Sequence, residues 1–381
     1  MKTFVVPIEG LLAPRRFTVG PVNFYPSTDE LSFIDATHRI EEYANRVARP
    51  GEQYRVVAVV EHESIDLALS VIEVAIQVLR AFQYGLIQSA HYTHFGLPGE
   101  ITHSNIVFYY QDSTTGGYGF KNNGLFLGFE LQENGIVSWE QHAEPLQFAA
   151  SAINNPVASD GAKRALKGVE LFAQSILVKD PDLRVLLVMA SLEGMLKPDN
   201  KSSGTFILAR KLAYLSCWNT NSCGQINGQP CPCIVFNPDI KEDRNSLKKI
   251  RRLSQTDTRW LCTYWAEVVE WYETRSSLAH GRPEGTPLTE ASAFAYWSYR
   301  EYMKPTLTWL MTHPASPTVD LDVAIRTLES ESANRIDWHK AVNTGRIPNP
   351  SDPPIHRDFF SIFLGFLRTK VPNLRRSSRR S

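Results

Sequence analysis

Five helix-length segments follow one another between residues 160 and 313, and they constrain the fold of this chain more than any other feature. Each segment spaces its apolar residues as one face of an α-helix does, and every connection but one is short. The segments are residues 161–177, 181–196, 203–217, 259–280 and 289–310. Helices joined by short connections pack as neighbours, so this part of the sequence predicts an α-helical bundle.

The part before the helices has a different pattern. Short β-rich segments at 4–8, 54–62 and 104–112 predict strands, and residues 124–141 predict a hairpin around the turn Glu133-Asn134-Gly135. Residues 64–85 predict a buried helix that Ser64 caps. The fold class expected for the whole chain is therefore α+β.

We expect three domains. A mixed α/β domain over residues 1–155 would serve as a sensor or recognition module, although no motif there assigns it a task. An α-helical domain over 156–315 carries a cysteine-rich insertion at 217–233. A carboxy-terminal extension, 316–381, contains one further helix, a proline-rich linker, a compact apolar segment and a basic tail.

Charge and hydropathy narrow the classes of function. The chain has 40 basic and 40 acidic residues, so binding to nucleic acid through bulk charge is excluded and any such binding must be local. No run approaches the roughly 18 apolar residues that a membrane span needs, and the first residues lack the apolar core of a signal peptide. These features predict a cytosolic protein.

One helical face contains an arginine. On segment 259–280 the apolar positions Leu261, Trp265, Val268 and Tyr272 share a face, and Arg275 continues their spacing. A buried guanidinium is costly unless it is paired or borders a polar cleft, so Arg275 requires one of the two.

Two more ionisable residues, Glu193 and Arg210, also lie within apolar helical sequence. A purely structural interpretation pairs Glu193 with Arg210 or with Arg275 as a buried ion pair. It also explains His280, at the last turn of segment 259–280, by the negative end of the helix dipole. The functional interpretation instead has Arg275 and His280 border one groove.

The end of segment 259–280 resembles a motif of the HEPN superfamily (higher eukaryote and prokaryote nucleotide-binding domains). Its ribonuclease members carry an arginine, four to six residues and then a histidine at the end of a helix, as Arg275 and His280 do here. The sequence is most similar to the Apea-like branch, whose helix typically ends in Tyr-x-x-Arg-Ser-x-x-x-His-Gly. The residues that match this ending are Tyr272, Arg275, Ser276, His280 and Gly281. Glu193 and Arg210 match the earlier helices of that branch, in the same order. The resemblance covers about residues 160 to 313. Many catalytic members carry Asn, Asp or His where this chain has Ser276, a departure that bears on activity rather than on fold.

The resemblance implies a metal-independent endoribonuclease that needs no cofactor for catalysis. Arg275, His280 and Ser276 would be catalytic, with Glu193, Arg210 and Tyr272 supporting them. Because the family builds its cleft from two domains and this chain has one such motif, we expect a homodimer. The substrate would be RNA, including transfer RNA, in anti-phage defence or toxin-like abortive infection. The alternatives are a non-catalytic HEPN module that dimerises and binds RNA or nucleotide, and, with weaker support, an effector acting on DNA or at a membrane surface.

Four of the five cysteines lie close together, which suits a metal site better than a disulfide framework. Cys217, Cys223, Cys231 and Cys233 have the number and type of ligands of a structural zinc site, and free loop thiols are the alternative. Cys262 stands apart in the sequence.

Other local patterns have simpler explanations. The histidines at 91, 94 and 103 lack further ligands and predict a solvated loop, and the glycine-rich segment 114–124 lacks the ending of a phosphate loop. The basic segments 248–252 and 374–380 would bind phosphates without sequence preference, or form solvated surfaces.

Overall fold

The computed structural model describes residues 2–8, 10–26, 56–86, 95–97, 107–111, 118–122, 129–130, 133–178, 180–196, 205–220, 234–237, 239–241, 243–256, 262–279 and 297–331. The chain divides into two compact units. The first combines Met1–Met195 with Pro287–Ser316, and the second combines Leu196–Thr286 with Pro317–Ser381. The three domains predicted from the sequence have other bounds and stay a prediction.

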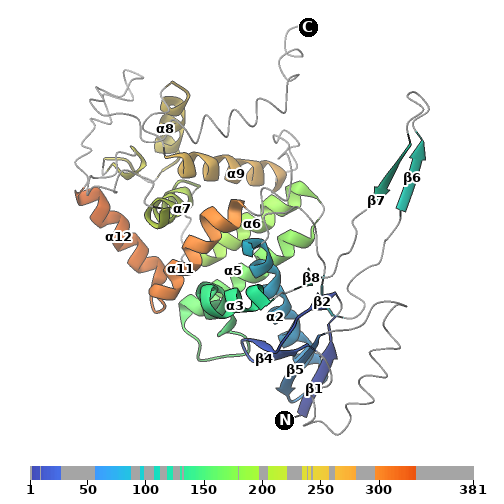
Figure 1. The fold of residues 1–381 in the computed structure, drawn as a ribbon. Helices are drawn as coiled ribbons and strands as arrows, with labels where there is room; N and C mark the ends of the chain where they lie inside the picture. Colours follow the sequence, from blue (N-terminus) through green and yellow to red (C-terminus); the bar gives the residue numbers. More distant parts are fainter. Residues whose placement is uncertain are drawn as a thin grey trace. The chain divides into compact units, whose positions relative to one another are not determined.

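An antiparallel sheet with the strand order β1-β5-β4-β3 forms one side of the first unit (Figure 1). Its strands are β1 (Lys2–Pro7), β3 (Phe17–Val19), β4 (Val22–Tyr25) and β5 (Val57–His62). The turn from β3 to β4 contains Gly20 at φ +56°, a conformation that tight hairpin turns require. A Cβ on Gly20 would lie 2.6 Å from the carbonyl oxygen of Ala150, so this turn also packs closely on a helix.

Helices cover this sheet and form the rest of the first unit. They are α2 (Ile65–Leu86), α3 (Glu133–His142), α4 (Glu144–Ala150), α5 (Asp160–Leu177), α6 (Pro181–Leu196), the π-helical turn Tyr299–Met303 and α11 (Lys304–Thr312). The sequence explains two of their ends: Ser64 accepts a hydrogen bond from the Leu67 amide at 3.4 Å at the start of α2, and Ser159 caps α5. Helix α2 packs on β5 and on α5, so it forms the centre of this unit.

Arg184 binds the backbone carbonyl oxygens at the carboxy-terminal end of α5. Its side chain, on α6, is 2% exposed and donates hydrogen bonds to the carbonyl oxygens of Ser175, at 3.1 Å, and Val178, at 2.5 Å. These carbonyls lie at a helix end, where backbone acceptors need partners from elsewhere. The free-energy cost of burying this arginine is therefore offset by its hydrogen bonds to the carbonyl oxygens at the end of α5.

Four short strands in two pairs complete the described part of this unit. β2 (Leu11–Leu12) pairs with β8 (Phe129–Glu130) in parallel, and β6 (Val107–Gln111) pairs with β7 (Tyr118–Asn122) antiparallel. The strands predicted at 4–8, 54–62 and 104–112 are confirmed as β1, β5 and β6.

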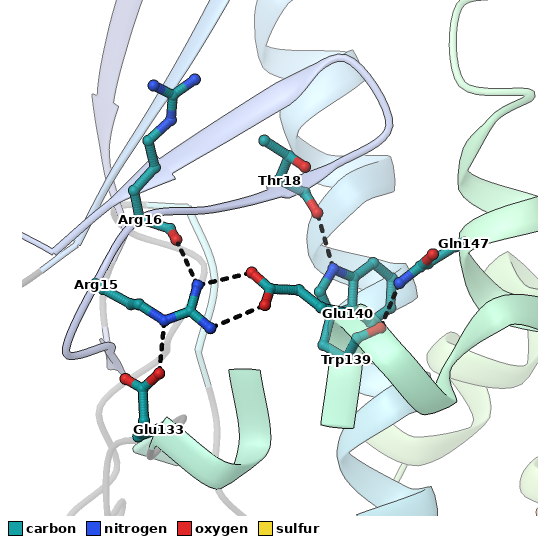
Figure 2. Close-up of polar contacts among 7 residues, drawn as sticks. All are labelled: Arg15, Arg16, Thr18, Glu133, Trp139, Glu140 and Gln147. Carbon is teal, nitrogen blue, oxygen red and sulfur yellow. Dashed lines mark hydrogen bonds and ion pairs between the residues drawn. The ribbon is translucent and has the colours of Figure 1, made fainter. Parts of the chain in front are cut away.

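The hairpin predicted around Glu133-Asn134-Gly135 is wrong, because these residues begin α3. Figure 2 shows the contacts that favour the helix. Arg15 donates hydrogen bonds to Glu133 at 2.6 Å and to both carboxylate oxygens of Glu140 at 2.7 and 2.8 Å. The Trp139 indole donates to the carbonyl of Thr18 at 2.8 Å. Long-range contacts that need Glu133 and Glu140 on one helical face thus outweigh a local turn signal.

The second unit is described by four helices and a short 3₁₀ turn: α7 (Thr205–Thr220), Ile234–Phe236, α8 (Arg244–Thr256), α9 (Thr263–Ala279) and α12 (Pro317–Glu331). Helix α7 packs against α9 through Phe206 and Trp265, whose rings meet edge to face with centroids 6.2 Å apart. Helix α8 lies within residues 217–259, the one long connection between the helical segments that the sequence predicts.

The described chain is α+β, as the sequence predicted. Its helices α5, α6, α7 and α9 confirm four of the five predicted segments, and the fifth is confirmed where the structure describes it, from Trp297 onward. Within the described residues, no helix is long and apolar enough to cross a membrane.

Candidate functional site

Helix α9 carries the arginine of the predicted catalytic pair in its last turns. Trp265 and Val268, on the first half of the helix, are 1% and 0% exposed. Farther along the same face the side chains become partly exposed, since Tyr272 and Arg275 are both half-buried. Arg275 therefore lies at the border between the core and the surface, whereas the sequence predicted a buried position.

The guanidinium of Arg275 lies over the ring of Tyr272, with its central carbon 5.1 Å from the ring centroid. The two residues are three apart on a helix, so they share a face, and the ring attracts the cation. The following residue, Ser276, is also half-buried. His280 lies outside the described residues, one position beyond the last residue of α9.

Arg210 is a buried residue of α7, as its apolar sequence context predicted. It is 5% exposed, and its guanidinium carbon lies 6.0 Å from the ring centroid of Phe206 and 5.8 Å from that of Phe236. It forms an ion pair with Glu329 of α12. The neighbouring Lys211, 3% exposed, pairs with Asp322 of the same helix at 2.9 Å.

These two ion pairs attach α12 to α7. Both cations are buried and both carboxylates come from one helix, so losing α12 would leave two desolvated charges on α7. The sequence did not indicate Glu329 as a partner for Arg210, because the two residues are far apart in the chain. The contact explains Arg210 structurally, and a role in catalysis stays a prediction.

Glu193 is half-buried on α6. It belongs to the first unit, whereas Arg210 and Arg275 belong to the second. Its predicted pairing with either arginine stays a prediction.

The cysteine at the end of α7 has a neighbour that the sequence did not suggest. The sulfur atoms of Cys217 and Cys262 are 3.5 Å apart, and the two residues are 7% and 3% exposed. Two sulfurs bound to one tetrahedral Zn²⁺ at about 2.3 Å lie about 3.8 Å apart, which is close to this spacing. Cys223, Cys231 and Cys233 lie outside the described residues, and within those that are described no group of three metal-ligating side chains occurs.

An ion pair joins α8 to α9. Arg251 of α8 pairs with Glu273, which is two residues before Arg275. Desolvation, followed by repulsion from Glu273, raises the pKa of Glu270 on α9, and the charge of Arg251 opposes this. Helix α8 and the candidate site on α9 are therefore neighbours within the second unit.

Comparison of the chain with protein-family models, with curated proteins and with solved structures finds no match in any of the three. Any function therefore has to be argued from the residues themselves.

Proposed function

We propose that this protein is a metal-independent endoribonuclease of the HEPN type, with Arg275 and His280 as catalytic residues and Ser276 assisting them. The observation that supports this best is the position of Arg275. It lies half-buried over Tyr272 in the last turns of α9, five residues before His280 in the chain. An arginine at a core border can meet a ligand, whereas one enclosed in the core cannot.

The residue types suit cleavage of RNA by its own 2′-hydroxyl. That reaction needs a group that takes or gives a proton near neutral pH, and histidine does so without a large change in pKa. It also builds negative charge on the phosphoryl oxygens, which a guanidinium stabilises through two hydrogen bonds while staying protonated. Ser276 would add a hydrogen bond to the phosphate. The expected products carry a 2′,3′-cyclic phosphate and a 5′-hydroxyl.

The wider role follows the resemblance described above. The protein would act in the cytoplasm as a homodimer, cutting RNA such as transfer RNA in anti-phage defence or toxin-like abortive infection. The residues of α9 beside Arg275 would form part of the dimer interface.

The second candidate function is a non-catalytic HEPN module that dimerises and binds RNA or nucleotide. The observation in its favour is Ser276, which stands where many catalytic members have Asn, Asp or His. Binding would still use the Arg275 guanidinium, but no proton transfer would be required of His280.

Variants of the two proposed catalytic residues separate these functions. Arg275→Ala and His280→Ala should each lower cleavage of a mixed RNA pool by at least about a hundredfold, the usual size of a lost electrostatic contribution for the arginine and of a lost general acid–base contribution for the histidine. RNA binding by His280→Ala should stay close to that of wild type. If wild type binds RNA but does not cut it, and expression of wild type and of His280→Ala is equally harmless to cells, the binding module is the correct function.

We also propose a structural zinc site that is anchored by Cys217. Four thiolates would fill the tetrahedral shell, so this metal would stabilise the fold and take no part in catalysis. Cys262 joins Cys223, Cys231 and Cys233 as a candidate ligand because of its distance from Cys217, and Cys217 with three of these four cysteines would fill the shell. Purified protein should contain one zinc per chain, and Cys217→Ser should lose it. Metal-free protein with titratable thiols at all these positions would contradict the site.

A further inference from the structure

Helix α8 concentrates positive charge in a chain whose total charge is zero. Its thirteen residues include no acid and five basic side chains, all of them exposed: Arg244, Lys248, Lys249, Arg251 and Arg252. At about 100° per residue, all of these except Lys249 fall within an arc of about 100°. They extend over about 12 Å of the helix axis at about 1.5 Å per residue.

The opposite face of α8 holds the helix on the protein. Ile250 and Leu253 are 0% and 4% exposed, and Ser246 is buried beside them. At the start of the helix, the Ser246 amide donates a hydrogen bond to the Asp243 carboxylate at 2.8 Å. This bond is the main reason that the pKa of Asp243 is lowered. The helix is thus capped and anchored, so its basic face has a fixed position.

Acidic residues beside α8 include Asp243, which caps its first turn, and Glu270 and Glu273 on α9. Glu273 pairs with Arg251, and the charge of Arg251 also acts on Glu270. No ion pair within the described residues involves the other four cations, Arg244, Lys248, Lys249 and Arg252. We name these four residues the α8 basic face, of which Arg244, Lys248 and Arg252 lie within the arc and Lys249 lies about 60° beyond its edge.

We propose that the α8 basic face binds the phosphate backbone of the RNA strand that is cleaved at Arg275. The choice of RNA as the partner rests on the proposed function, whereas the need for a polyanion rests on the charges alone. The ion pair between Arg251 and Glu273 connects this helix to α9 two residues before Arg275, so α8 lies beside the part of α9 that carries the candidate site.

The burial of α8 argues against an anionic membrane as the partner. A helix that binds a lipid surface inserts its apolar face among the acyl chains. Here Ile250 and Leu253 are already covered by the protein, so only the cations are available. Contact through cations alone fits a flexible chain of phosphates, which releases bound counterions when basic side chains replace them.

The release of counterions makes RNA binding depend on salt concentration to an extent that can be measured. Four phosphate contacts on a single strand give a slope of log affinity against log salt of about −3, at about −0.7 per contact. Replacing all four cations should therefore remove this part of the salt dependence, so the slope of log affinity against log salt should become less steep by about 3. At low salt the affinity should fall by at least about tenfold.

The test measures fluorescence anisotropy of labelled single-stranded RNA whose 2′-hydroxyls are methylated, so that it cannot be cut. The test variant combines Arg244→Gln, Lys248→Gln, Lys249→Gln and Arg252→Gln, and glutamine keeps helix propensity. The matched control changes four other exposed cations to glutamine, at Lys2, Lys163, Lys167 and Arg326, with the same loss of net charge. Circular dichroism verifies that both variants fold.

We expect loss of affinity and of salt slope in the test variant only. With unmodified RNA, that variant should have a raised KM and an almost unchanged kcat. Equal losses in both variants, no loss in the test variant, or preferential binding of wild type to phosphatidylserine vesicles would each overturn the proposal. If wild type binds RNA through α8 but cuts none, the surface stands and the nuclease proposal fails. If cutting persists unchanged in the test variant, the nuclease stands and the surface fails.

Discussion

Arg15 shows how much of a local structure one side chain can determine. It precedes β3 and meets two carboxylates of α3, Glu133 and Glu140, that lie two helical turns apart (Figure 2). Its hydrogen bonds are the main reason that the pKa of Glu140 is lowered from its ordinary value of 4.5, while slight burial acts in the opposite direction. The same bonds raise the pKa of Arg15, so its guanidinium stays protonated and only Glu140 loses its charge in acid.

This pair predicts a pH dependence of stability. Because the folded state lowers the pKa of Glu140, its stabilising effect is complete above 4.5 and is lost as the pH falls through the folded value. Glu140→Gln should therefore unfold more easily than wild type in urea at neutral pH, and the difference should shrink as the pH falls well below 4.5. Glu61→Gln, an exposed carboxylate on β5, is the control and should show no such convergence. A difference for Glu140→Gln that stays constant with pH would contradict this.

At the scale of elements, two glycines with opposite surroundings test how helices pack in the first unit. The amide of Gly161, on α5, donates a hydrogen bond to the Pro314 carbonyl at 2.9 Å. A Cβ there would lie 2.8 Å from the Leu310 carbonyl oxygen and 2.9 Å from the Pro314 Cα. A Cβ on Gly194, on α6, would meet no atom within 4 Å.

Gly161→Ala should lower the free energy of unfolding by about 1–3 kcal/mol, because backbone atoms at the end of α11 have to move. Gly194→Ala should raise it by about 0.5–1 kcal/mol, because glycine is a poor helix former and the position has room. Urea unfolding measures both. The packing of α5 on α11 described here would be wrong if Gly161→Ala were as stable as wild type.

The elements that the sequence predicted well are those that local periodicity determines. Helices α2, α5, α6 and α7 follow from their caps and apolar spacing within a residue or a few. Helix α3 was missed because Asn134-Gly135 is a strong turn signal, and the contacts that overrule it come from Arg15 and Thr18, more than a hundred residues away. No local pattern contains such information.

Helix α8 was missed although its signal was present. Leu247, Ile250 and Leu253 recur every three residues between cations, which is typical of an amphipathic helix. The basic segment 248–252 was interpreted only by its charge, so the apolar spacing around it did not lead to a predicted helix. For the candidate site, the sequence located Arg275 on a helix face, but it could not show where burial ends along that face or that Cys262 lies beside Cys217.

At the scale of the whole molecule, the proposed activity requires two chains, since one chain supplies one Arg275 and one His280. Sedimentation should show a dimer. Mixing excess Arg275→Ala with wild type and allowing exchange should lower cleavage by more than simple dilution of wild-type chains, because mixed dimers hold one intact motif. A monomer that still cuts RNA would contradict the shared cleft.

The central claim is metal-independent cleavage at Arg275 and His280, and the most direct test is the chemistry of the product ends. Wild-type protein and the two alanine variants are incubated with a mixed RNA pool that includes transfer RNA, in EDTA, and the ends are identified. We predict 2′,3′-cyclic phosphate and 5′-hydroxyl ends from wild type and intact RNA from Arg275→Ala and His280→Ala. Cleavage that EDTA abolishes, 5′-phosphate ends, or equal cleavage by the variants would contradict the claim.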